Sequence, residues 1–90
     1  MASIKIKEIN LTTYLVTVVD SVATQHEVTV PITYAISLTA SKISTEQLVR
    51  NAFEFLLARE PNTSILKNFE LGKIGVYFGE FEETMLNLLP

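Results

Sequence analysis

The segment from Ser44 to Pro61 constrains the fold more than any other part of the sequence, because it contains a helix start, an apolar stripe and a helix stop. Ser44 and Gln47 fit a capping box, in which the Ser44 hydroxyl accepts from the Gln47 amide and the Gln47 side chain reaches back to Ser44. Apolar residues then recur at helical spacing: Leu48, Val49, Ala52, Phe53, Phe55, Leu56 and Leu57. Pro61 ends the helix, because the residue before a proline avoids the α region. We therefore expect a helix from Thr45 to about Arg59 that lies across a sheet.

The first thirty residues supply that sheet, because polar and apolar residues alternate there with the period of a half-buried strand. We predict strands over Ser3–Ile9, Tyr14–Val19 and Thr24–Val30, joined by turn residues into a three-stranded antiparallel meander. Lys5 and Lys7 suit an edge position for the first strand. The second strand is β-branched and apolar on both faces, so it is predicted to lie in the middle.

The segment after Pro31 fits two structures. Proline is well placed in a first helical turn because it lacks an amide hydrogen, which favours a short helix from Ile32 to about Thr39. Tyr34, Ile36 and Leu38 also alternate, as they would in a strand. Of the two, we expect the helix.

The C-terminal part is expected to complete the core with shorter helices. Asn62 or Thr63 can cap a further turn from Ser64 to Phe69. After a cluster of glutamates, an apolar tail from Met85 to Leu89 is expected to fray or to dock on a partner.

Between these segments, residues 71–79 are open to two interpretations. Helical steps separate the apolar residues Leu71, Ile74, Tyr77, Phe78 and Phe81. Gly72 and Gly75 each weaken a helix by about 1 kcal/mol relative to alanine, and residues 74–78 would also serve as a strand. The sequence leaves helix and strand as alternatives there.

Length and composition limit the classes of protein that this chain can belong to. Ninety residues are enough for one core, so we expect a single α+β domain over residues 1–90. With 48% hydrophobic residues and a mean hydropathy of +0.30, some apolar surface is expected to meet a partner, most simply another copy. The absence of cysteine excludes disulfides, thiolate catalysis and cysteine-based metal sites. Apolar runs are too short for a membrane span or a signal peptide, so we expect a cytoplasmic protein.

Residues that carry chemistry are few. His26 is the only histidine, so any triad, metal cluster or proton relay would depend on it alone; we interpret it as a strand residue satisfied by solvent or a backbone carbonyl. Glu80, Glu82 and Glu83 are interpreted as a solvated acidic turn, since their spacing matches no calcium-binding loop. The three glycines match no phosphate-binding motif. We therefore expect no catalytic, cofactor-binding or metal-ligating residues, and a protein that is not an enzyme.

The aromatic residues are interpreted as core. Their flanks are mostly glutamate and aliphatic residues, whereas stacking surfaces for nucleic acid interleave aromatics with Lys and Arg. The set comprises Phe53, Phe55, Phe69, Tyr77, Phe78 and Phe81. The net charge of −3 also opposes attraction to a phosphate backbone.

The second strand supplies the one candidate site. Leu15, Thr17 and Val19 point away from the side occupied by its other apolar residues. If helices cover one side of the sheet, the apolar side chains on the other side stay exposed to solvent, and binding a partner would bury them. We therefore predict a partner interface at these three residues in a small interaction or self-associating domain.

The stretch from Leu48 to Pro61, followed by Ser64-Ile65-Leu66 and later by Tyr77-Phe78, resembles a family of small prokaryotic proteins of unknown function. The resemblance runs from the third strand to Glu83 and implies helices in this part of the chain. This chain differs from the family pattern at its three glycines, which implies a looser last helix. No activity is assigned to that family, so the resemblance implies a fold and no site residues.

A weaker, partial resemblance is to ribbon-helix-helix regulators. The strand His26–Val30, a short helix, and then Ser44–Ala52 are similar to the order of elements in that fold. Such proteins dimerise by pairing their strands and read the major groove with strand side chains. This strand carries Glu27 and Thr29 in place of Arg or Lys, and the preceding meander occupies the edge needed for dimerisation. A DNA-binding regulator or antitoxin is the alternative function.

Overall fold

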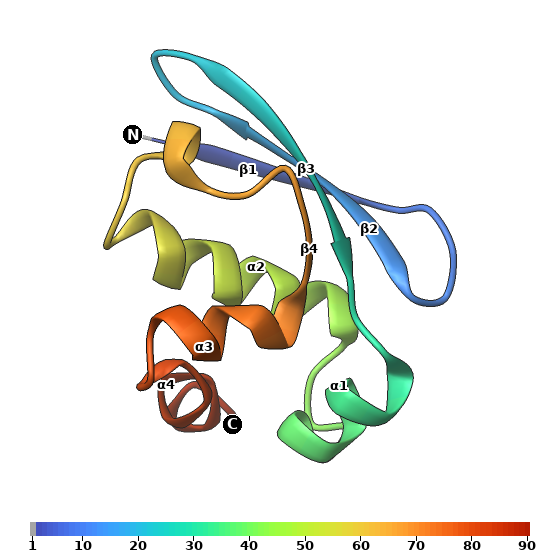
Figure 1. Cartoon of the computed structure of the whole chain (residues 1–90). Coiled ribbons are helices and arrows are strands. Elements are labelled where there is room, and N and C mark those ends of the chain that lie inside the picture. Colours follow the sequence, from blue (N-terminus) through green and yellow to red (C-terminus); the bar gives the residue numbers. More distant parts are fainter. Residues whose placement is uncertain (1) are drawn as a thin grey trace.

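The alternating N-terminal segments form three neighbouring strands in the computed structural model, which describes residues 2–90. They are β1 (Ser3–Glu8), β2 (Thr13–Val19) and β3 (Ala23–Thr29), and each pairs antiparallel with the next. The order β1-β2-β3 puts β1 at an edge and β2 between two partners (Figure 1). The three antiparallel strands of the predicted meander are therefore present, with the second strand between the other two, but they form only part of the sheet.

A fourth strand makes the sheet larger than expected. β4 (Asn68–Glu70) pairs parallel to β3 on its other edge, so the sheet is mixed and four-stranded rather than a meander alone. The expected turn over Ser64–Phe69 is wrong in position. The 3₁₀ helix η1 (Asn62–Ser64) comes earlier and has no side-chain cap, and the chain then leads into β4.

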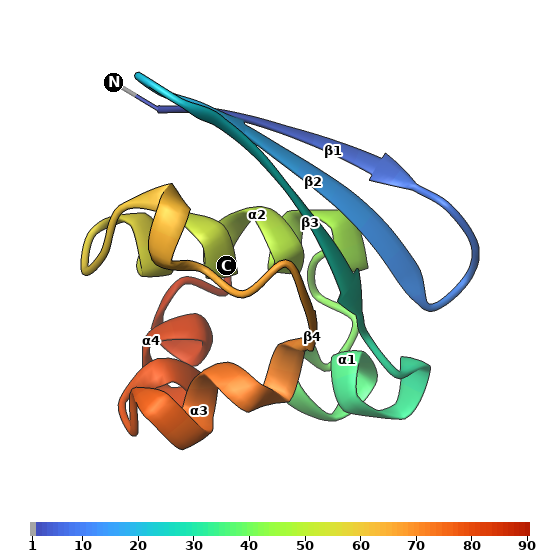
Figure 2. The same cartoon turned by 45° about the horizontal axis from the view of Figure 1, so that its top comes forward.

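The helices form a second layer on one side of the sheet (Figure 2). They are α1 (Ile32–Thr39), α2 (Thr45–Leu57), the 3₁₀ helix η2 (Leu71–Lys73), α3 (Ile74–Tyr77) and α4 (Phe81–Asn87). The expected helices after Pro31 and Ser44 are confirmed, although α2 ends two residues before Arg59. Residues 71–77 are helical, which decides between the two interpretations of that segment. Within residues 2–90, no helix has the length and apolar character needed to cross a membrane.

The start of α2 follows half of the predicted capping box. The amide of Gln47 donates to the Ser44 hydroxyl oxygen at 3.1 Å. The return contact is wrong, because the Gln47 side chain donates instead to Asn51 Oδ1 at 2.8 Å, one turn further along the helix. Further along α2, Arg50 donates from its guanidinium to the backbone oxygen of Ile4 at 3.1 Å and so ties α2 to the edge strand β1.

One buried cluster joins the inner face of the sheet to the helices. Its largest fully buried side chains include Phe53 of α2, Phe81 and Met85 of α4, and Leu71 of η2. The expected fraying of the tail is therefore wrong for Met85, which is 1% exposed inside this cluster. Helix α4 turns the last apolar residues back toward the core, although Leu86 and Leu88 remain exposed.

Candidate functional site

We refer to the surface of the sheet that points away from the helices as the open face. It consists of Ser3, Lys5 and Lys7 from β1, Thr13, Leu15, Thr17 and Val19 from β2, Ala23, Gln25, Glu27 and Thr29 from β3, and Asn68 and Glu70 from β4. On β2 the alternate residues, which point toward the helices, are buried (Tyr14, Val16 and Val18). No helix of residues 2–90 lies on the open face (Figure 2).

The three residues predicted as a partner interface lie in one row along the middle of the open face. Leu15 and Thr17 are half-buried by their neighbours in the sheet, and Val19 is 40% exposed. The structure therefore brings the predicted residues together on a surface that is only partly shielded from solvent.

Charged residues flank this row with opposite signs on its two sides. The strand register places Lys7 beside Leu15 on one side and Glu27 beside Leu15 on the other. Strands lie about 4.8 Å apart, so Lys7 and Glu27 are separated by about 10 Å across Leu15. Glu70 of β4 adds a second acidic residue on the β3 side, opposite Thr29 in the register. The open face is thus basic along β1, apolar along its middle and acidic along β3 and β4.

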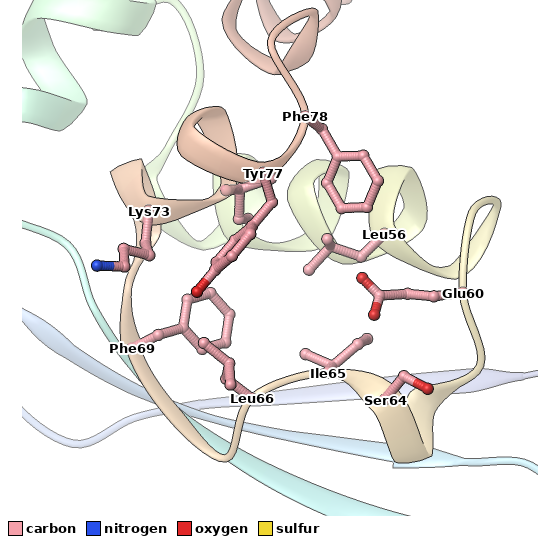
Figure 3. Close-up of a pocket in the computed structure, with 10 residues that line it drawn as sticks. Leu56, Glu60, Ser64, Ile65, Leu66, Phe69, Lys73, Tyr77 and Phe78 are labelled. Carbon is pink, nitrogen blue, oxygen red and sulfur yellow. The ribbon is translucent and has the colours of Figure 1, made fainter.

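A second surface feature is a pocket of about 320 Å³ in the helix layer, which we refer to as the α3 pocket (Figure 3). It is lined by Leu56, Glu60, Ser64, Ile65, Leu66, Phe69, Lys73, Ile74, Tyr77 and Phe78. Its floor is made by buried residues such as Leu56, Ile65 and Phe69, whereas Leu66 and Tyr77 on its walls are 47% and 63% exposed. Most of the lining is therefore apolar, with polar groups at the mouth.

The α3 pocket is not predicted by the sequence. The helical spacing of Tyr77 predicts a core residue, but α3 is a single turn of four residues and buries only Ile74. The adjacent aromatic residues Tyr77 and Phe78 are the sequence signal for such a surface. Consecutive residues of a helical turn point in different directions, so the two rings cannot both enter the same core.

One wall of the α3 pocket is held by the only histidine. His26 is 1% exposed, and its Nδ1 lies 2.8 Å from the backbone oxygen of Leu66. A carbonyl oxygen only accepts, so Nδ1 carries the hydrogen, and in the neutral ring Nε2 accepts from the Thr24 hydroxyl at 2.9 Å. Both ring nitrogens are thus occupied within the protein, as expected for a histidine satisfied partly by a backbone carbonyl.

Asn62 fixes the start of the same wall. Its side-chain amide donates to the backbone oxygen of Val22 at 2.8 Å and to the Thr24 hydroxyl at 2.9 Å. These bonds tie η1 to the turn between β2 and β3 and to the start of β3. Asn62 therefore acts across 38 to 40 residues of sequence, and the local helix cap predicted for it is wrong.

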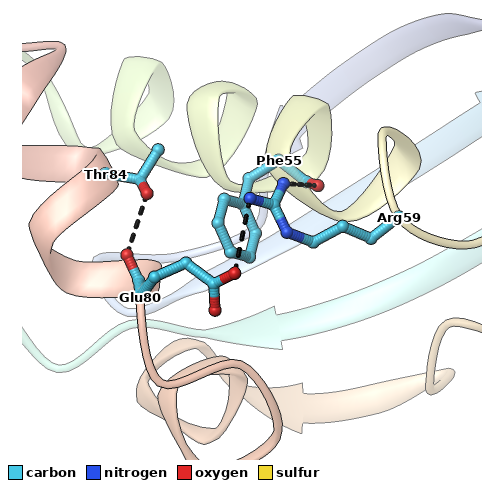
Figure 4. A network of polar contacts seen from close by, with 4 residues as sticks. All are labelled: Phe55, Arg59, Glu80 and Thr84. Carbon is cyan, nitrogen blue, oxygen red and sulfur yellow. Dashed lines mark hydrogen bonds and ion pairs between the residues drawn. The ribbon is translucent and has the colours of Figure 1, made fainter.

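The three C-terminal glutamates are exposed to solvent, as interpreted, but Glu82 and Glu83 lie in the first turn of α4, and Glu80 and Glu82 each have a side-chain partner. The Arg59 guanidinium stacks 3.5 Å above the Phe55 ring, donates to the Phe55 backbone oxygen at 2.9 Å and lies 3.7 Å from the Glu80 carboxylate (Figure 4). The Tyr34 hydroxyl donates to Glu82 at 2.8 Å and links α1 to α4. Among residues 2–90, no cluster of histidine and carboxylate side chains could hold a metal ion.

The fold and these two surfaces define a small α+β domain with an open-faced mixed sheet and an apolar pocket in its helix layer. Comparison with protein-family models, curated proteins and solved structures gives no significant match to this chain. The resemblance to small prokaryotic proteins of unknown function stays a prediction.

Proposed function

We propose that this protein is a non-enzymatic interaction domain that self-associates, with the open face of one copy packed on the open face of a second copy. The observation that carries this proposal is the row of Leu15, Thr17 and Val19 on a sheet face without a helix. Packed sheets lie about 10 Å apart, so a second copy would remove these side chains from water. Each CH₂ group buried in this way contributes about 0.8 kcal/mol.

Charge complementarity favours a second copy as the partner. A two-fold axis that runs parallel to β2, midway between the two sheets, places β2 over β2 and β1 over β3 of the other copy. Each residue keeps its position along the strand direction, so residues paired across the strands of one copy lie over the same set in the other. Leu15 then meets Leu15, and Lys7 lies opposite Glu27 of the other copy. An axis perpendicular to the strands would instead place β1 over β1, with lysine against lysine. The angle of about 30° between packed sheets leaves the central pairs close to one another.

The size of the open face sets the strength of this dimer. Strand spacing and residue rise give a face of about 20 by 15 Å, which is smaller than the roughly 800 Å² per partner of a stable interface. We therefore expect a weak dimer that forms at micromolar concentrations or above. Because part of its stability comes from Lys7 and Glu27 at the surface, raising the salt concentration should weaken it.

Light scattering over a range of protein concentrations tests the proposal, and the measured mass should rise from one chain toward two. The double variant Leu15→Thr, Val19→Thr keeps residues that favour strands and should remain monomeric. Val76→Thr is the matched control, because Val76 is 74% exposed on α3, away from the open face, and should leave the dimer intact. A wild-type protein that stays monomeric, or a double variant that dimerises equally well, contradicts the proposal.

Charge reversal tests the direction of the axis. Lys7→Glu and Glu27→Lys should each weaken the dimer, because like charges then face each other twice. An equal mixture of the two variants should dimerise again, since both cross pairs in the mixed dimer join opposite charges. The double variant that carries both changes should also dimerise.

The alternative, a ribbon-helix-helix DNA-binding regulator, has less support. Its dimerising strand would be β3, which is already paired with β2 on one edge and β4 on the other. A duplex-binding assay at low salt separates the two functions, because phosphate contacts give binding that falls steeply as salt is raised.

A further inference from the structure

We propose that the α3 pocket binds a small organic cation, with its apolar part on the pocket floor and its ammonium group at the Glu60 carboxylate. This site is separate from the open face and does not depend on self-association. The volume of about 320 Å³ lies at the lower end of the range of ligand pockets, so it suits one ring or a short branched chain rather than a cofactor.

The charged groups at the mouth of the α3 pocket determine the sign of the ligand. The Glu60 carboxylate points into the pocket, whereas the Lys73 ammonium group points away from it (Figure 3). Aromatic rings from Phe69, Tyr77 and Phe78 surround the same space, and aromatic faces attract cations. The net charge of −3 adds a long-range attraction for cations.

The walls of the α3 pocket are held in place before a ligand arrives. His26 bonds the Leu66 carbonyl, and Asn62 bonds the β2–β3 turn, so the wall from η1 to β4 is fixed to the sheet. On the other side, the Phe78 ring packs edge-on against Phe55 with centroids 5.9 Å apart. A ligand therefore meets a largely formed site, which reduces the ordering cost of binding.

Nuclear magnetic resonance titration with 2-phenylethylamine, which is a cation at pH 7, tests the proposal. Amide shifts should concentrate at residues 60–66 and 73–78. 3-Phenylpropionate and 2-phenylethanol present the same ring with a negative charge and with no charge. We expect the amine to bind about tenfold more tightly than the anion, as an exposed ion pair and a cation–aromatic contact together allow.

Glu60→Gln should remove the ion-pair part of this preference, so that the amine binds only about as much more tightly than 2-phenylethanol as the cation–aromatic contact allows. Glu46→Gln is the matched control, because it changes the net charge equally from the other end of α2, where Glu46 is exposed. Retained dispersion of the amide spectrum shows that each variant is folded. The proposal is overturned if the anion binds as well as the amine, if Glu60→Gln has no effect, or if no probe shifts the pocket amides at tens of millimolar. It is equally overturned if the same amides shift when the protein alone is concentrated, because a second copy would then cover the pocket.

Discussion

His26 donates from Nδ1 to the backbone oxygen of Leu66 at 2.8 Å, and these two residues are 40 positions apart in the sequence. His26 lies in β3 on the side of the sheet that faces α2, and its ring centroid is 5.4 Å from that of Phe53. Leu66 forms part of the wall of the α3 pocket. The bond therefore connects the buried side of the sheet to the segment that leads into β4. Next to it, the amide of Glu27 donates to the backbone oxygen of Lys67 at 2.8 Å and extends the same attachment.

Replacing this histidine should destabilise the fold through unpaired polar groups. His26→Phe keeps a ring of similar size against Phe53 but leaves the Leu66 carbonyl without its donor and the hydrogen of the Thr24 hydroxyl without its acceptor. We expect a loss of about 2–3 kcal/mol in the free energy of unfolding, measured by urea denaturation. Ser37→Phe, at an exposed position on α1 away from the open face, should change stability by less than about 0.5 kcal/mol. Equal effects of the two changes would show that the hydrogen bonds of His26 do not stabilise the fold.

The elements predicted correctly are those whose signals are local. Alternation over six or seven residues identified β1 and β3, a β-branched apolar run identified β2, and a hydroxyl cap with an apolar stripe identified α2. β4 has three residues and is stabilised by pairing with a strand some 40 positions earlier, so no local pattern could identify it. The interface on β2 stays a prediction, and it depends only on the alternation of side-chain direction along the strand and on which side of the sheet the long helix lies. The α3 pocket is built from segments that meet only in the folded chain, and its residues could not be grouped beforehand.

Tyr34 should make stability fall at alkaline pH. Burial, followed by the hydrogen bond and the charge of Glu82, raises the pKa of Tyr34 well above its ordinary value near 10. Above pH 10 the unfolded chain loses this proton while the folded chain keeps it, so the contribution is complete below about pH 10 and is lost as pH rises beyond it. Burial and the nearby Glu8 charge raise the pKa of Tyr14 as well, so part of the loss remains without Tyr34.

Tyr34→Phe separates that contribution from the rest. At pH 7 the variant should be less stable than wild type by about 1 kcal/mol, because the hydrogen bond to Glu82 is lost. Between pH 8 and pH 11 its urea midpoint should fall less than that of wild type. Parallel falls in the two proteins would mean that the protonated Tyr34 hydroxyl does not contribute to the pH dependence.

Arg59 should matter more than the glutamate with which it pairs. Its guanidinium contacts the Phe55 ring and the Phe55 backbone oxygen, whereas the Glu80 carboxylate lies 3.7 Å away and its side chain is 54% exposed. Arg59→Ala should therefore cost about 1 kcal/mol in stability, while Glu80→Gln should cost less than about 0.5 kcal/mol, as for other exposed ion pairs. Thermal denaturation at low and high salt measures both. A larger effect for Glu80→Gln would place the stabilisation in the ion pair instead.

Ala40 offers a change that should stabilise the protein. It follows α1 with a φ of 52° and a ψ of 31°, and its amide donates to the backbone oxygen of Ile36 at 2.8 Å. The left-handed conformation costs a residue with a Cβ about 1–2 kcal/mol, and glycine avoids that cost. Glycine also makes the unfolded chain more flexible, which lowers stability by about 0.5–1 kcal/mol because more entropy is lost on folding. Ala40→Gly should therefore gain up to about 1 kcal/mol, which corresponds to a rise of roughly 4–8 °C in Tm. Ala58→Gly, after α2 at a φ of −73°, has no such strain to relieve and should lower Tm; a fall in both variants would show that Ala40 is not strained.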